Sequence, residues 1–183
     1  DKASNVIRDI IHDTEMPSDL AQEIATTHGK MDAKYVAVRS SAAEDSSIAS
    51  WAGELETYLN TTGKNLLENV RMCWSSLFTP RAIFYRHEKN LLETKVSVAV
   101  VVQTMVQSEV SGITFTVHPV TQDGKQMIIE AGWGLGEAIV SGSITPDSYV
   151  VEKPSRAEGD FVFLDVNVNE QGRQMVREAK EGV

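Results

Sequence analysis

The chain has 183 residues, of which 42% are hydrophobic and 23% are charged, and its formal net charge is −9 at pH 7. This length suits one domain or two small lobes around a buried core. The acidic balance argues against non-specific binding to nucleic acid or to an acidic membrane, because both need an excess of Lys and Arg. It leaves room for a local basic site that binds a nucleotide.

Cysteine usage and hydropathy point to the cytoplasm. Cys73 is the single cysteine, so we expect neither an internal disulfide nor a cysteine cluster for zinc. The apolar run over residues 96–102 is shorter than the roughly 20 residues of a membrane span. We therefore expect a cytoplasmic globular protein that does not enter the membrane.

The first half of the chain predicts helices around two strands. Apolar residues at helical spacing predict helices over residues 6–11, 17–27, 64–78 and 80–92. Alternating and β-branched residues predict strands over residues 35–39 and 56–60. A polar loop of small residues, 40–53, connects these two strands.

The second half is rich in strand patterns. The nearly continuous apolar run over residues 96–106 predicts a strand in the middle of a sheet, with residues 112–117 and 127–130 as its neighbours. Further patterns predict a short helix over 135–141, strands over 148–152 and 161–168, and a terminal helix over 170–180. Because these elements do not alternate as βαβ units, we expect an α+β fold with an antiparallel or mixed sheet.

The segment VAVRSSAAED, residues 36–45, places an arginine at the end of a predicted strand. The guanidinium fork of Arg39 matches phosphate oxygens. Ser40 and Ser41 could donate hydrogen bonds to phosphate, or could simply close a turn. The alternative for Arg39 is a surface ion pair with Glu44 or Asp45.

The segment IIEAGWGLGEAIVSGS, residues 128–143, leads from a strand through glycines into a short helix. Gly132, Gly134 and Gly136 predict unhindered N–H donors at a helix start. The spacing matches neither a dinucleotide fingerprint nor a P-loop. Glu130 and Glu137 flank the turn and offer carboxylate oxygens of the kind that Mg²⁺ prefers. The alternative is a glycine turn whose glutamate stabilises the helix start.

Two further features complete the candidate nucleotide site. Gln103, Thr104, Met105 and Val106 close the long strand, where backbone groups can meet an adenine edge and Met105 can pack on the ring. The alternative is a strand that simply reaches the surface. Gly53 allows close approach of the backbone to a ligand, or a loop conformation with positive φ.

Five motifs occur in the chain in this order: VAVRSSAAED, SWAGELETYLN, CWSSLFTPRAIFYR, VVVQTMVQSEVSGITFTVHP and GWGLGEAIVSGSITPDSYVVEK. Together they resemble the nucleotide-binding domain of the family that contains phosphoenolpyruvate synthase and pyruvate, phosphate dikinase. Together they cover roughly residues 35–153. The resemblance implies a partial ATP-grasp-like domain, in which two lobes clasp Mg²⁺ and ATP between antiparallel sheets. Residues 1–95 would form the first lobe, incomplete at its start, and residues 96–183 the second lobe with the nucleotide hinge and the metal-binding glutamate.

The resemblance also implies a reaction, in which ATP donates a phosphoryl group to a histidine on a separate domain and then to pyruvate. ATP, pyruvate and water become AMP, phosphoenolpyruvate and phosphate. By match, Arg39 and Glu137 are the catalytic residues, Glu137 binds Mg²⁺ and Glu130 is its second candidate ligand. The same match assigns ATP binding to a set of residues: Arg39, Ser40, Ser41, Gly53, Gln103, Thr104, Met105, Val106 and Gly136.

We expect this chain to be a fragment. The family's early phosphate-contacting lysine would precede Asp1, and the phosphohistidine and pyruvate-binding domains would be partners elsewhere in the parent chain. An exposed lobe interface could also make the fragment oligomerise. Two alternatives remain: the nucleotide domain of a rifampin phosphotransferase-type antibiotic kinase, and a non-catalytic nucleotide-binding module, which would form no AMP.

Overall fold

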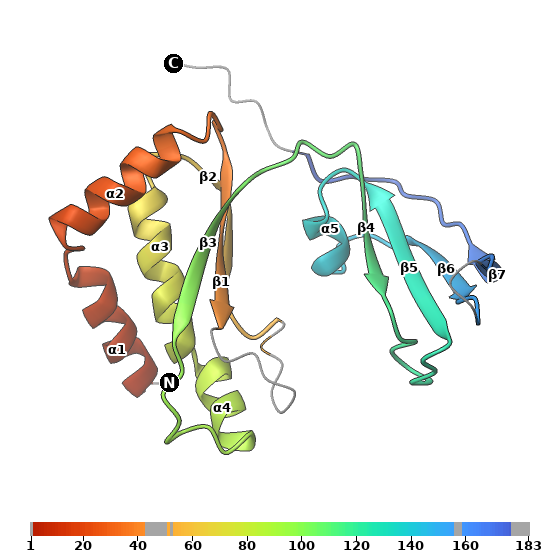
Figure 1. Cartoon of the computed structure of the whole chain (residues 1–183), viewed down its shortest axis with the longest axis horizontal. Helices are drawn as coiled ribbons and strands as arrows, with labels where there is room; N and C mark the ends of the chain where they lie inside the picture. Colours follow the sequence, from red (N-terminus) through yellow and green to blue (C-terminus); the bar gives the residue numbers. More distant parts are fainter. Residues whose placement is uncertain (1, 43–50, 52, 156–158, 177–183) are drawn as a thin grey trace. The chain divides into compact units, whose positions relative to one another are not determined.

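The computed structural model describes residues 2–42, 51, 53–155 and 159–176. The chain forms two compact units, Asp1–Met105 and Val106–Val183, and each is described by itself (Figure 1). The division comes after Met105 and not after residue 95, where we expected it, because the strand that follows residue 95 pairs within the first unit. In the described part of the chain, no helix is long and apolar enough to cross a membrane.

The first unit combines helices with a three-stranded antiparallel sheet of order β2-β1-β3. Its elements are α1 (Lys2–Asp13), α2 (Ser18–Gly29), β1 (Val36–Ala42), β2 (Thr57–Thr61), α3 (Leu66–Ser75), the 3-10 turn η1 (Ser76–Phe78), α4 (Pro80–Glu88) and β3 (Val98–Thr104). In Figure 1, α1, α2 and α3 lie on one side of this sheet. In the described part of this unit, these three helices therefore cover one face of the sheet.

Strand alternation explains the core of the first unit. Val36 and Val38 on β1 are fully buried and pack against Leu66, Val70 and Cys73 on α3. Burying an apolar side chain of this size contributes about 1.5–3 kcal/mol. Because successive side chains of a strand point to opposite faces, Ala37 between the two valines and Arg39 directly after them face away from the helices.

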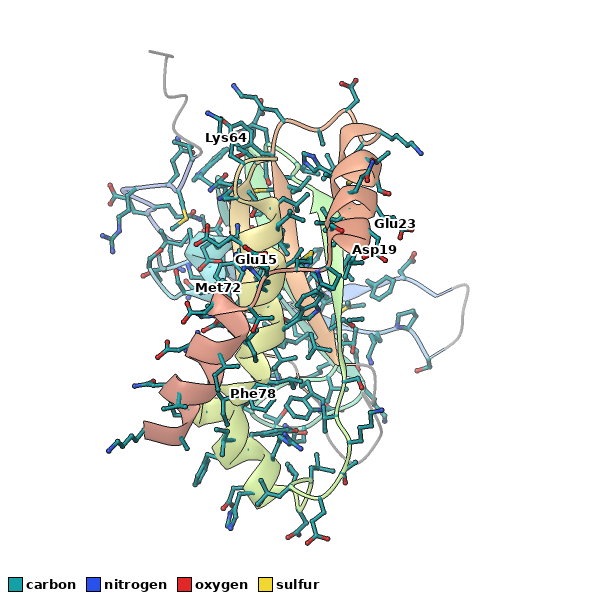
Figure 2. The ribbon with its side chains drawn as sticks, turned by 90° about the vertical axis from the view of Figure 1, so that its left-hand side faces the viewer. Glu15, Asp19, Glu23, Lys64, Met72 and Phe78 are labelled. Atoms are coloured by element: carbon teal, nitrogen blue, oxygen red, sulfur yellow. The ribbon has the colours of Figure 1, made fainter. Side chains whose placement is uncertain are left out.

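The outer surface of the helical layer is acidic. Figure 2 looks onto this layer and shows Asp19 and Glu23 on α2, and Glu15 in the link between α1 and α2. All three residues are exposed. Carboxylates here contribute to the net charge of −9 and repel a phosphate. These three carboxylates therefore disfavour the binding of a nucleotide beside them.

Helix α4 ends at Glu88, earlier than the expected end near residue 92. Asn90 has a φ of 54°, a left-handed conformation that does not continue a helix. Arg86 then donates hydrogen bonds from Nη2 to the carbonyl oxygens of Leu91 at 3.2 Å and Thr94 at 3.0 Å. These bonds satisfy backbone acceptors in an irregular segment, which apolar periodicity alone does not reveal.

The second unit is a four-stranded antiparallel sheet of order β4-β5-β6-β7, with one short helix. Its elements are β4 (Val110–Phe115), β5 (Gln126–Trp133), α5 (Glu137–Val140), β6 (Asp147–Glu152) and β7 (Val162–Asn167). The prediction that β4 and β5 neighbour β3 in one sheet is wrong. Strand β3 lies at the edge of the first sheet, and Val101 on its non-helical face is 47% exposed.

The predicted terminal helix over residues 170–180 is also wrong for its described part. Residues 170–176 are not helical, and Met175 instead forms a parallel bridge with Gly134. Residues 177–180 lie outside the described residues. Contacts with a distant turn override the weak helical pattern, as tertiary context commonly does.

Candidate functional site

Arg39 lies on the face of the first sheet that points away from α3. Its neighbours across the sheet are Val101 on β3 and Thr57 on β2. The exposed guanidinium donates from Nη1 to Oε1 of Gln103 at 3.2 Å. This neutral partner orients the side chain without neutralising its charge, which suits an anionic ligand. The alternative partners, residues 44 and 45, lie outside the described residues.

The two serines after Arg39 point in opposite directions. Strand β1 continues through them, whereas the sequence predicted a loop from Ser40 onward. The Ser40 hydroxyl donates to the carbonyl of Glu56 at 2.9 Å and lies 3.1 Å from Oγ of Ser76. Ser41 is exposed and shares the face of Arg39. Ser40 therefore packs the sheet against the helices, and Ser41 is the serine placed beside Arg39.

The expected phosphate loop is described only at its ends. Residues 43–50 and 52 lie outside the described residues. Trp51 is buried, and its ring meets that of Tyr85 edge-on at 5.2 Å. Gly53 has a φ of 78°, and an added Cβ would meet no heavy atom within 4 Å. Backbone conformation, and not crowding, is thus what favours glycine at this position.

The expected adenine hinge spans the boundary between the two compact units. Gln103 and Thr104 end β3 with exposed side chains. Met105 is half-buried, and its sulfur accepts a hydrogen bond from the N–H of Asn60 at 3.0 Å. Val106 begins the second unit and is 75% exposed. The segment is therefore anchored at Met105 and presents polar groups just before it.

The glycine turn, residues 132–136, begins at the last two residues of β5 in the second unit. Three consecutive N–H groups of this turn are bonded within the chain: Trp133 to Oε1 of Gln171 at 3.0 Å, Gly134 to O of Glu109 at 2.8 Å and Leu135 to O of Met175 at 2.8 Å. These three N–H groups are occupied, so the expectation of unhindered donors at the three glycines is wrong for Gly134 in this conformation. Sequence reasoning missed Gln171 and Met175, although the clustered glycines signalled a close backbone approach.

The glycines of the turn differ in how much space surrounds them and in their backbone conformation. Gly134 has a φ of 83°, and an added Cβ would lie 2.2 Å from the carbonyl oxygen of Met175. At Gly132 an added Cβ would lie 2.6 Å from Cδ1 of Ile144. Gly136 has an ordinary φ of −57° and only van der Waals contacts around it. Close packing against backbone therefore requires glycine at Gly134, the contact at Gly132 is with the flexible end of a side chain, and Gly136 remains open to a ligand role.

The two candidate carboxylates lie in the second unit. Glu130 is half-buried in the middle of β5, opposite Ile113 and Ser148 on the neighbouring strands. Glu137 is the exposed first residue of α5. Among the described residues, no group of three or more His, Cys, Asp or Glu side chains is placed to hold a metal ion. One or two carboxylates fit Mg²⁺ when phosphates and water supply its other ligands.

The candidate residues thus fall into two sets, one in each unit. Arg39, Ser41 and the 103–105 segment belong to the first unit, and Glu130, Gly136 and Glu137 to the second. The family described as pyruvate phosphate dikinase, AMP/ATP-binding domain, matches residues 1–183. The chain belongs to this family. Its membership confirms the resemblance seen in the five motifs, and the helices with antiparallel sheets confirm the α+β class.

Several relatives of this family member are phosphoenolpyruvate synthases by name. A probable phosphoenolpyruvate synthase of Methanothermobacter thermautotrophicus is 46% identical over 188 residues, which cover 97% of this chain and 27% of that protein. The phosphoenolpyruvate synthase of Pyrococcus furiosus is 47% identical over 82% of this chain and 19% of its own length. A probable phosphoenolpyruvate synthase of Archaeoglobus fulgidus is 60% identical over 67% of this chain and 16% of its own length. The chain therefore spans about a quarter or less of the relatives it matches.

Proposed function

We propose that this chain is the ATP-binding domain of a cytoplasmic phosphoenolpyruvate synthase-like dikinase. The observation that carries the proposal is the family match over residues 1–183, together with relatives that bear that enzyme's name. The whole reaction would convert ATP, pyruvate and water to AMP, phosphoenolpyruvate and phosphate. A histidine on a separate domain would carry the phosphoryl group, and pyruvate bound on a third domain would receive it.

Each compact unit would form one lobe of an ATP-grasp-like clasp, with the 103–106 segment as the hinge along the adenine. The support in the first unit is the sheet face that carries Arg39. Phosphoryl transfer depends chiefly on positioning and on stabilising charge that spreads over phosphate oxygens. Arg39, oriented by Gln103 at 3.2 Å, would hold phosphate oxygens, and Ser41 would add a hydroxyl donor. Gly53, which has a φ of 78°, would allow close approach of the backbone to the nucleotide.

The acidic residues of the second unit would hold the metal. Mg²⁺, when bound with ATP, neutralises phosphate charge and orients the transferring group. Glu137 is exposed and would reach the metal directly, whereas half-buried Glu130 is the weaker candidate. Gly136, which lies next to Glu137 and has no close packing partner, would admit a phosphate oxygen near its backbone.

The test uses the full-length parent protein of this chain and measures formation of AMP from ATP with pyruvate or with a rifamycin as the acceptor. Glu137→Gln keeps the size of the side chain and removes its charge, so we expect AMP formation to fall at least about tenfold. Glu152→Gln, an exposed glutamate at the end of β6, is the matched control and should retain wild-type turnover.

The outcomes separate this proposal from its alternatives. Normal turnover in Glu137→Gln would contradict the metal assignment. AMP formation that needs a rifamycin and not pyruvate would indicate an antibiotic phosphotransferase. No AMP formation with either acceptor would indicate a non-catalytic nucleotide-binding module.

A further inference from the structure

Residues 169–175, which we call the strap, run along the end of the second sheet beside the glycine turn. At one end, Asn169 donates from its backbone N–H to Oδ1 of Asp147 at 2.9 Å and from Nδ2 to the carbonyl of Pro146 at 2.7 Å. At the other end, Met175 forms the parallel bridge with Gly134. The strap is therefore tied to the fold on both sides of Gln171.

Gln171 occupies the place of a missing strand residue. Its Oε1 accepts from the N–H of Trp133 at 3.0 Å, and its Nε2 donates to the carbonyl of Ala131 at 3.4 Å. On this side of β5 the pairing with β6 ends at Ala131, opposite Asp147. The carboxamide acts like a peptide group that continues the ladder beyond β6. It thereby fixes the last residues of β5, where the glycine turn begins.

Two glycines of the turn lie in close contact with the strap. An added Cβ at Gly132 would lie 3.1 Å from Oε1 of Gln171, and one at Gly134 would lie 2.2 Å from the carbonyl oxygen of Met175. Gly134 therefore needs glycine because the backbone of the strap lies against it, whereas at Gly132 the side chain of Gln171 would have to shift by only a few tenths of an ångström. This is independent of the hydrogen bonds, and it indicates that strap and turn form one packed element.

The glycine turn sets the position of Glu137. Gly136 is the N-cap of α5, and Glu137 is the first of only four helical residues. A helix this short does not fix its own position in water, so the preceding turn has to do so. The Glu137 side chain is exposed, and neighbouring side chains therefore do little to hold it. Its carboxylate is placed mainly through the backbone of the turn.

We propose that Gln171 is a positioning residue, which holds the glycine turn and through it aims Glu137 at the Mg²⁺ of bound ATP. This inference rests on the proposed function. Groups that orient a metal ligand commonly change metal affinity about 10- to 100-fold when they are removed. The strap thus adds to the clasp a part that touches neither nucleotide nor metal.

The experiment measures amide hydrogen exchange and ATP affinity on the 183-residue chain, with Mg²⁺ and without it. Gln171→Met keeps the length of the side chain and removes both amide hydrogen bonds. We expect exchange at Trp133 to rise about two- to tenfold, as loss of one hydrogen bond predicts. We expect the gain in ATP affinity from Mg²⁺ to fall about tenfold or more. Gln174→Met, on the same strap, is the matched control and should change neither quantity.

A second variant separates positioning from a purely structural role. In a Glu137→Gln background the Mg²⁺-dependent gain is already lost, so Gln171→Met should lower it no further. Unchanged exchange at Trp133 would overturn the inference whatever ATP does. Faster exchange at Trp133, with an unchanged gain in ATP affinity from Mg²⁺, would also contradict the inference, because Gln171 would then have only a structural role. If wild type showed no Mg²⁺-dependent ATP binding, the proposed function and the aiming of Glu137 would both fail, while exchange would still report whether Gln171 holds the turn.

Discussion

Tyr58 couples the ionisation of one residue to the stability of the first unit. Its hydroxyl donates to the carboxylate of Glu56, which also accepts a hydrogen bond from Arg8 at 3.4 Å. Burial, and then the bond and charge of Glu56, raise the pKa of Tyr58 well above its usual range. The folded protein therefore keeps the phenolic proton at a pH where the unfolded chain loses it.

The sign of the pH dependence follows from this raised pKa. Below about pH 10 both states hold the proton, and the contribution to stability is complete. As pH rises further, only the unfolded state deprotonates, so the free energy of unfolding falls. Urea unfolding at pH 8, 9.5 and 11 should show this decrease in wild type and a shallower one in Tyr58→Phe. An equally steep decrease in that variant would contradict the assignment.

Single residues show what a sequence can and cannot predict about a site. Arg39 was predicted because an arginine at a strand end is recognisable, and the structure places it on the sheet face away from the helices. Ser40 was grouped with Ser41 because the strand was expected to end before both. Its inward hydroxyl bonds join residues far apart in the chain, such as Ser76. The role of Gln171 was missed for the same reason, since its partners lie about forty residues away.

Helix α4 shows how one local interaction starts an element. The Oγ1 atom of Thr79 accepts a hydrogen bond from the N–H of Ala82 at 3.1 Å, and Pro80 occupies the first turn. Replacing an N-cap threonine by alanine costs about 0.5–2 kcal/mol. We expect Thr79→Ala to lower the free energy of unfolding by about that amount, measured by urea denaturation. Thr79→Ser keeps the acceptor and should retain most of the stability; equal losses in both variants would show that the cap is not the cause.

Elements with a strong local pattern were predicted better than their partners. The apolar stripe of α3 and the start of α4 at Pro80 can be read directly from spacing, and both are present. The sheet position of β3 was wrong, because a continuous apolar run was taken as burial on both faces. Among the described residues, β3 pairs only with β1. Strand pairing depends on residues distant in sequence, and periodicity carries no information about it.

At the scale of the whole molecule, the two compact units carry complementary chemistry. The first offers the positive charge of Arg39 in an otherwise acidic chain, and the second offers Glu130 and Glu137. A site for Mg²⁺ and ATP needs both kinds of charge, because phosphate oxygens bind a positive side chain and Mg²⁺ binds carboxylates. The two units divide after Met105, which lies within the segment that we propose as the adenine hinge.

The most direct test of this account is calorimetric titration of the chain with ATP, with and without Mg²⁺, in wild type, Arg39→Ala and Arg71→Ala. Arg71 lies on α3 and donates to the carbonyl of Thr14 at 3.0 Å on the helical side, away from the proposed site. We expect Mg²⁺-dependent binding that Arg39→Ala weakens about 10- to 100-fold, as loss of a charged hydrogen bond predicts, and that Arg71→Ala leaves unchanged. Wild-type affinity in Arg39→Ala, or equal weakening in both variants, would contradict the account.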